Sequence, residues 1–300
     1  MDHRIFLANL PPATRADLTR LTNWNAGWHL FAHALLIAIM GGFILTGAPG
    51  WPLALIAQGV LLAFGFTLMH EASHRTAFRS EPVNDRVAQI VGFILFLPPA
   101  WFRYYHFAHH KFTQDPARDP ELATPRPNSL GAYLWHVTGI PTWTSQGRAL
   151  LLNAAGRTRW DYVPAPQRNA VTREARVMVG LYIILAVVSL VQGWTVLIWL
   201  WLVPLLIGQP VLRLFLLAEH GQCPQVANMF ENSRTTYTAR IIRFLSWNMS
   251  YHAEHHANPR VPYHQLPQMH DLCHAHLGST SDGYVQFNRD YVAALPVGAD

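Results

Sequence analysis

Eight of the seventeen histidines lie in three short clusters, and each cluster adjoins an apolar segment. The first cluster has HxxxH spacing and the other two have HxxHH spacing. Residues at i, i+3 and i+4 of a helix project from one face. Neutral imidazole is a common ligand of iron, copper and zinc. We therefore expect three such faces to converge on one or two metal ions, with these ligands: His70, His74, His106, His109, His110, His252, His255 and His256.

A ninth candidate ligand is His220, which ends an apolar segment as His70 does. Eight or nine imidazoles are too many for one ion, because a zinc site takes about four ligands. Two octahedral ions with exchangeable positions could use four or five histidines each, and this favours a pair of iron ions. His270 and His274 also have HxxxH spacing, but no apolar segment adjoins them, so we assign them to a surface helix.

Carboxylates are expected near the imidazoles, because neutral ligands would leave two metal ions strongly cationic. Carboxylates that accept hydrogen bonds from ligand rings also fix the orientation of those rings. A salt bridge to one of the many arginines is an equally good explanation for each candidate. No side chain is expected to act as a nucleophile, so catalysis would rest on the metal centre alone. The candidate carboxylates are Glu71, Asp115, Asp119, Glu121 and Glu254.

The elements that position these residues are predicted to be membrane helices. The chain has 300 residues, of which 51% are hydrophobic and 13% are charged, whereas soluble domains usually carry about twice that charge. Four segments approach the ~20 apolar residues that a membrane-crossing helix needs. A shorter apolar segment, 87–101, is broken by Pro98 and Pro99 and is expected to be re-entrant or interfacial. The four predicted spans are 28–46, 51–69, 177–191 and 195–217.

We therefore predict an all-α membrane protein with four transmembrane helices in two hairpins, a re-entrant or interfacial helix, and a cytosolic cap that carries the histidines. Six spans is the main alternative. The spans 177–191 and 195–217 form the second hairpin, in which Pro204 and Pro210 are expected to kink the second helix. Segment 130–152 is expected to be an amphipathic helix on the bilayer.

The chain is expected to be one domain. Its parts would be a cytosolic N-terminal segment, 1–26, membrane hairpins, 27–217, with a cytosolic middle loop, 103–176, and a cytosolic cap, 218–300. The hairpin tips hold no Lys or Arg, whereas the middle loop holds many. The positive-inside rule then places both termini and the metal site in the cytoplasm, with a bacterial inner membrane as the expected location. Because the basic residues are spread along the chain, the net charge of +5 does not indicate a nucleic-acid partner.

The three clusters, ordered around two apolar hairpins, resemble those of the integral-membrane fatty acid desaturase superfamily over roughly residues 70–267. The resemblance implies a non-haem di-iron centre that uses O2 to oxidise an unactivated C–H bond in a lipid acyl chain, with fatty acyl desaturation as the expected reaction. It implies that the eight cluster histidines and His220 are the iron ligands. Further similarity to bacterial desaturase-type sequences lies in 113–116, 118–121, 232–236, Pro259 and Pro262.

The resemblance also implies a lipid or fatty acyl substrate and an external electron donor of the ferredoxin or cytochrome type, since the sequence has no His-Pro-Gly-Gly haem-binding motif. We expect a substrate channel between the apolar helices. Arg234 is a candidate for binding an anionic headgroup. Aromatic residues near the clusters are candidates for the channel lining, although such residues are also common at membrane interfaces. They are Trp101, Phe102, Tyr104, Trp247 and Tyr251.

Three other functions are compatible with parts of this pattern. A hydroxylase or ketolase acting on a lipid or carotenoid would share the same di-iron site. Residues 70–74, HEASH, match the HExxH pattern of zinc metalloproteases, with Glu71 as general base, but an intramembrane protease would leave six clustered histidines unused. A non-catalytic metal-binding or transport protein would need charges inside the spans, where Arg213 stands almost alone.

Overall fold

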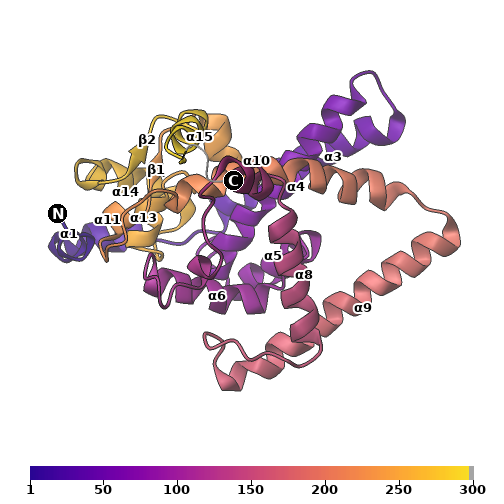
Figure 1. Ribbon diagram of the computed structural model, residues 1–300, viewed down its shortest axis with the longest axis horizontal. Coiled ribbons are helices and arrows are strands. Elements are labelled where there is room, and N and C mark those ends of the chain that lie inside the picture. The colour runs from indigo at the N-terminus through magenta and orange to yellow at the C-terminus, as the bar shows by residue number, and fades with distance from the viewer. Residues whose placement is uncertain (297–300) are drawn as a thin grey trace.

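The computed structural model describes residues 1–296 and is mostly helical. Its membrane-length helices form two hairpins, and their mean hydropathy of 1.9 to 2.0 confirms the prediction of an all-α membrane protein with four spans. The hairpin tips lie at one end of the molecule, and the short helices around the N-terminus lie at the other (Figure 1). The four helices are α3 (Trp24–Thr46), α4 (Trp51–Ser73), α9 (Arg168–Gln192) and α10 (Val203–His220).

All four helices extend beyond the apolar segments that predicted them. Helix α4 continues past residue 69 and includes His70, and α9 begins at Arg168 rather than at 177. Polar residues at a helix end outside the apolar segment still make backbone hydrogen bonds. Hydropathy alone therefore omits these ends from the predicted helices. A π-helical turn, η3 (Ile198–Leu202), leads into α10, where Pro204 falls in the first turn and Pro210 falls inside the helix.

The short apolar segment forms two helices rather than one, α5 (Glu81–Ile94) and α6 (Pro99–Phe112), with a bend of 102° between them. The bend lies at Pro98 and Pro99, where the sequence predicted a break. Each arm has 14 residues, which is shorter than a bilayer crossing requires. The first free N–H of α6, on Ala100, donates to Glu174 Oε2 of α9 at 2.6 Å. This carboxylate caps α6 from another helix and fixes where α6 begins.

The middle loop corrects one expectation. Segment 130–152 is two helices, α7 (Leu130–Val137) and α8 (Ile140–Ala154), rather than one. The break falls at Gly139, which has a φ of +73° and whose Cβ position would lie 2.3 Å from Gln209 Cγ. Only glycine tolerates both this left-handed backbone and the close approach of α10.

The cap consists of short elements that follow α10 and pack with the N-terminal helices (Figure 1). Its two-residue strands β1 (Thr235–Thr236) and β2 (Thr280–Ser281) pair in parallel. The N-terminal helices are α1 (His3–Asn9) and α2 (Pro12–Leu18). The remaining helices are α11 (Met229–Asn232), α12 (Arg240–Leu245), α13 (His252–Ala257), α14 (Leu266–Cys273) and α15 (Tyr284–Ala293), with short turns η1 (Pro120–Ala123), η2 (Ala165–Gln167), η4 (Tyr263–Gln265) and η5 (His274–His276).

The two hairpins are held together by a glycine contact between α4 and α10. A Cβ on Gly59 would lie 2.2 Å from Pro204 O, and a Cβ on Gly208 would lie 1.9 Å from Gly59 O. Small residues allow membrane helices to approach this closely, so that backbone packs on backbone. Because α4 ends near His70 and α10 ends at His220, the same contact sets the distance between two candidate ligands.

We expect Gly208→Ala to destabilise the protein by about 1–3 kcal/mol, because the added methyl group must push α4 and α10 apart. Thermal unfolding of the detergent-solubilised protein would measure the loss. Gly42→Ala is the matched control, since a Cβ at Gly42 of α3 meets no atom within 4 Å. Equal unfolding temperatures for the two variants would contradict this account of the hairpin contact.

Candidate metal centre

The nine candidate histidines meet in two adjacent groups. In each group, one nitrogen from every ring lies within 4.8 Å of the others. The rings of His110 and His256, one from each group, stack with their centroids 4.0 Å apart. Every member is buried except His74 and His110, which are half-buried. We call the first group site A (His70, His74, His106, His110 and His255) and the second group site B (His109, His220, His252 and His256).

Each of the two HxxHH clusters contributes histidines to both sites. On α6, His106 and His110 are four residues apart and reach site A, whereas His109 reaches site B. On α13 the pair four residues apart, His252 and His256, reaches site B, and His255 reaches site A. A rotation of either helix would therefore disturb both sites together.

The nitrogen spacing fits bound metal ions. His106 Nε2 lies 2.9 Å from both His74 Nε2 and His110 Nε2. A neutral imidazole nitrogen carries either one hydrogen or one lone pair, so it cannot make two good hydrogen bonds at once. In site B, His220 Nε2 lies 3.0 Å from the Nε2 atoms of both His109 and His252. Two nitrogens about 2.1 Å from one ion and at right angles would be about 3.0 Å apart.

Buried ring nitrogens without hydrogen-bond partners in site A also indicate a metal site. Both ring nitrogens of His70 are buried and have no hydrogen-bond partner within residues 1–296, and the same is true of Nδ1 of His110 and His255. An unsatisfied buried polar atom costs about 1–3 kcal/mol. Converging lone pairs that coordinate an ion would remove this cost, so the residues present fit the metal pair that the sequence predicted.

The histidines of α13 are in the form that binds metal. Burial lowers the pKa of His252, His255 and His256 well below the ordinary value, and neighbouring imidazoles lower it further. Neutral imidazole is the ligand form, so these rings need not release a proton at neutral pH before they bind an ion.

Two arginines fix the helix ends that carry ligands. Arg103 of α6 donates from Nε to Ser73 O at 2.9 Å, directly before His74, and so joins the first two clusters. Arg234 donates from one nitrogen to Ala218 O and Gly221 O at 2.7 and 2.6 Å, on either side of His220. The expectation that Arg234 binds a headgroup is therefore wrong, because its guanidinium is buried against the end of α10.

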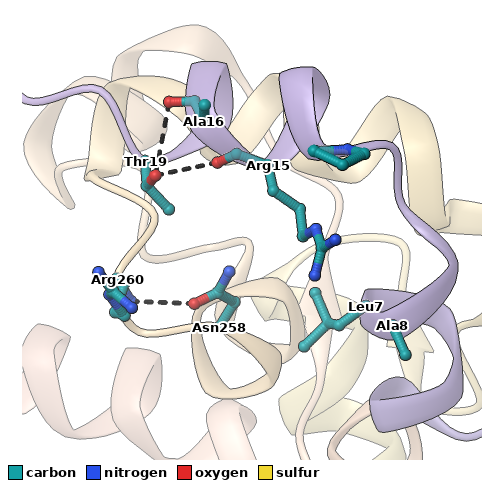
Figure 2. Close-up of a pocket in the computed structure, with 8 residues that line it drawn as sticks. Leu7, Ala8, Arg15, Ala16, Thr19, Asn258 and Arg260 are labelled. Atoms are coloured by element: carbon teal, nitrogen blue, oxygen red, sulfur yellow. Dashed lines mark hydrogen bonds between the residues drawn. The ribbon is translucent and has the colours of Figure 1, made fainter.

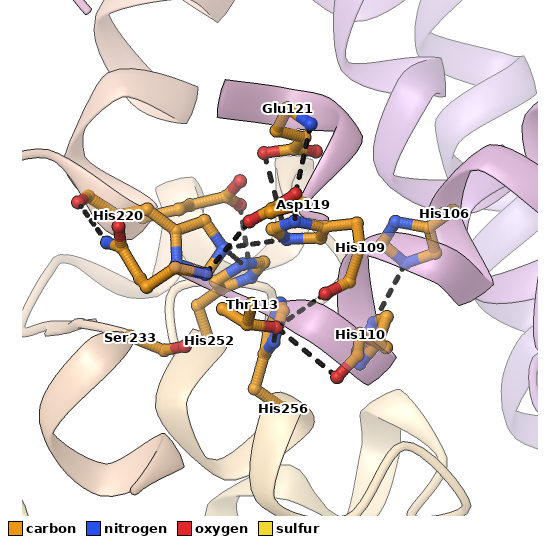
Figure 3. Close-up of polar contacts among 12 residues, drawn as sticks. His106, His109, His110, Thr113, Asp119, Glu121, His220, Ser233, His252 and His256 are labelled. Carbon is orange, nitrogen blue, oxygen red and sulfur yellow. Dashed lines mark hydrogen bonds and ion pairs between the residues drawn. The ribbon is translucent and has the colours of Figure 1, made fainter. Parts of the chain in front are cut away.

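Site B has three carboxylate neighbours, two of which, Asp119 and Glu121, are labelled in Figure 3. Asp119 Oδ1 lies 2.9 Å from His109 Nδ1, the position expected of an orienting carboxylate. Glu121 Oε2 lies 3.7 Å from His109 Nε2. Glu219 Oε1 lies 3.3 Å from His252 Nδ1, although it is not aligned for a hydrogen bond. Glu219 was not predicted from the sequence, in which its only signal is its position directly before His220.

Three other carboxylates do not orient metal-binding rings, contrary to expectation. Glu71 Oε1 accepts from Tyr263 N at 2.9 Å. Asp115 is paired with Arg118 near the surface. Glu254 is bound to Thr235 and His270. The position of Glu71 also gives no support to the HExxH protease, because its carboxylate is fully buried and held by backbone.

The predicted channel residues lie at several places around the site. Trp247 is buried and stacks on His29 with ring centroids 4.0 Å apart, and the Tyr251 hydroxyl accepts from Arg243. Trp101 and Phe102 are buried and Tyr104 is half-buried on α6. A pocket of about 480 Å³ lies between α1, α2 and residues 258–260, and none of these aromatic residues lines it (Figure 2). The substrate channel therefore stays a prediction.

Helix α13 has one side chain available to anchor it. Its sequence is HAEHHA, so Glu254 is its only residue that is neither alanine nor a candidate ligand. The fully buried Glu254 carboxylate accepts from Thr235 Oγ1 of β1 and contacts His270 Nδ1 of α14. A six-residue helix has little stability of its own. These two contacts therefore set the orientation of the third cluster.

The fold and the site agree with comparisons to known proteins. A family model described as "Fatty acid desaturase" matches residues 47–288, which include all nine histidines. The sphingolipid delta(4)-desaturase DES1 of Drosophila melanogaster is 29% identical over 213 residues, which are 67% of this chain and 59% of the fly protein. The sn-1 oleoyl-lipid 12-desaturase of Picosynechococcus sp. is 22% identical over 256 residues, which are 76% of this chain and 71% of that protein.

We expect His270→Ala to weaken metal binding by roughly tenfold to a hundredfold, because Glu254 loses one of the two partners that hold α13. Competition with a chelator would measure the affinity at both sites, since α13 contributes to each. His274→Ala is the control, because this histidine is exposed and its hydrogen bond is to Asp271 O rather than to Glu254. Equal affinities for the two variants would show that His270 does not position α13.

We expect the metal-free protein to lose stability as the pH falls below about 6.5. Burial lowers the pKa of His252, His255 and His256, so the unfolded chain binds more protons than the folded chain below the ordinary histidine pKa. Thermal unfolding between pH 7.5 and pH 5.5, with and without bound metal, would test this. A metal-free unfolding temperature that is constant over this range would contradict it.

Proposed function

Because this chain belongs to the fatty acid desaturase family, we propose that it is a membrane oxidoreductase that introduces a double bond into a lipid acyl chain. The observation that carries the proposal is the convergence of nine histidines into two groups at the ends of membrane helices. The sequence analysis gives no reason to prefer hydroxylation or ketolation, and both relatives are named as desaturases.

The proposed cofactors are two iron ions, one in site A and one in site B. When bound, such a pair supplies the activation of O2 for C–H oxidation. The balanced reaction takes two hydrogens from neighbouring CH2 groups and combines O2 with two further electrons and two protons to form two water molecules. The two electrons require an external donor, which we propose to be a ferredoxin or a cytochrome.

The protein's own part is to place and shield this centre. The ends of α4 and α10 bring His70 and His220 to one end of the hairpins, while α6 and α13 supply the remaining rings. Every ligand except His74 and His110 is buried, which excludes bulk water from the reaction. The hairpins would deliver an acyl chain from the bilayer. The arginine-rich middle loop supports a cytoplasmic metal centre in a bacterial inner membrane.

The substrate is proposed to be a lipid-bound acyl chain. The fly relative is named for a sphingolipid and the cyanobacterial relative for an oleoyl lipid. The chain spans 59% of the length of the fly relative, so neither headgroup is transferred to this protein. Both kinds of lipid contain an aliphatic chain, and apolar helices are suited to bind such a chain.

We expect protein purified from iron-supplemented cells to contain about two iron atoms per chain. We also expect the membranes of cells that express the protein to accumulate unsaturated acyl chains. Elemental analysis, Mössbauer spectroscopy and lipid mass spectrometry would measure these outcomes. His109→Ala should abolish desaturation, whereas His276→Ala should not, because His276 lies on η5 outside both sites. Hydroxylated lipids would favour a hydroxylase, and about one zinc per chain without iron would contradict the proposal.

A further inference from the structure

The two sites differ in their surroundings. Within residues 1–296, the carboxylates that contact candidate metal ligands all belong to site B: Asp119 and Glu121 lie against His109, and Glu219 lies against His252. The five rings of site A have no carboxylate contact in this part of the chain. Site A also has five imidazoles, whereas site B has four. Site B is thus one imidazole short and is the only site with anionic side chains.

Glu121 lies on the ligand side of site B rather than behind it. Its Oε2 is 3.7 Å from His109 Nε2. That nitrogen faces the metal position, because His109 Nδ1 is held by Asp119 and Nε2 lies 3.0 Å from His220 Nε2. Asp119 and Glu219 instead lie against Nδ1 atoms, on the outer side of the rings. Figure 3 shows Glu121 above the His109 ring, with Asp119 beside it.

The backbone at Glu121 is fixed by the same residue that orients His109. Asp119 Oδ1 accepts from Glu121 N at 2.9 Å and lies 2.9 Å from His109 Nδ1, while Asp119 Oδ2 accepts from Gln114 N at 2.9 Å. One carboxylate therefore sets both the start of η1 and the ring of His109. Asp119 therefore fixes the backbone of Glu121 beside the His109 ring.

The Glu121 carboxylate has no other partner in the described chain. It accepts no hydrogen bond and pairs with no arginine or lysine among residues 1–296, although Asp115, six residues earlier in this loop, is bound to Arg118. The distance of 3.7 Å is too long for a hydrogen bond. The Glu121 side chain is 37% exposed, which leaves it room to rotate toward an ion.

We propose that Glu121 is the fifth protein ligand of site B. This rests on the proposed function, since it requires metal in both sites. Site A then has five neutral imidazoles, and site B has four imidazoles and one carboxylate. Carboxylate is a harder ligand than imidazole and carries a negative charge, so the ion in site B is better stabilised in its more oxidised state. The two ions are chemically inequivalent.

The test compares Glu121→Ala and Glu121→Gln with Asp115→Asn, which removes a carboxylate from the same loop without touching either site. Each protein is purified intact in nanodiscs, stripped of metal and titrated with Fe²⁺ and with Co²⁺ under anaerobic conditions. Chelator competition gives the two affinities, Mössbauer spectra report each iron, and the visible bands of Co²⁺ report the ligand set. Thermal unfolding of the metal-free proteins checks that the variants fold.

We expect two distinct iron signals in the wild type. In Glu121→Ala, one signal should change and one of the two affinities should fall by roughly tenfold to a hundredfold, while Asp115→Asn behaves as wild type. Unchanged spectra and affinities in a folded Glu121→Ala would overturn the inference, whatever the activity. Wild-type protein that binds two inequivalent irons but oxidises no lipid would overturn the proposed function and leave the role of Glu121 standing.

Discussion

Buried imidazole nitrogens without protein partners are the constraint on which this structure depends. Within residues 1–296, seven of the nine candidate ligands are buried and two are half-buried, and in site A both nitrogens of His70 lack a partner. The chain places them at the ends of helices whose other residues belong in lipid or in the cap. Three interactions hold these helices in place. They are the contact between Gly59 and Gly208, the hydrogen bond from the start of α6 to Glu174, and the hydrogen bonds from Arg234 to the end of α10.

The features repeated along the chain were predictable from sequence. Histidine spacing and hydropathy identified the two hairpins and the set of nine rings, including His220. Which of the candidate carboxylates contacts a ligand ring was not predictable. Glu71, Asp119 and Glu254 look alike in sequence and differ only in the residue that each contacts. The break at Gly139 depends on Gln209 of another helix, which no local pattern reveals.

The two sites differ in how firmly their rings are held. Each site B ring has a polar neighbour at Nδ1: Asp119, the Asn232 carbonyl, Glu219 or Thr113. In site A, His70, His110 and His255 have no such partner within residues 1–296. Site B is therefore organised by the protein, whereas site A depends more on the ion itself for the orientation of its rings.

Because the second and third clusters contribute to both sites, each proposed ion would cross-link distant parts of the chain. In site A, His110 and His255 are 145 residues apart, and in site B, His109 and His220 are 111 residues apart. Closing a loop of about a hundred residues with a covalent bridge removes unfolded-state entropy worth about 4.7 kcal/mol. A metal-starved chain would lose two such closures at once. Its cap would then be held to the hairpins only by packing and by hydrogen bonds such as those from Arg234 to the end of α10. The supply of the proposed metal ions would therefore govern how long the folded protein survives proteolysis in the cell.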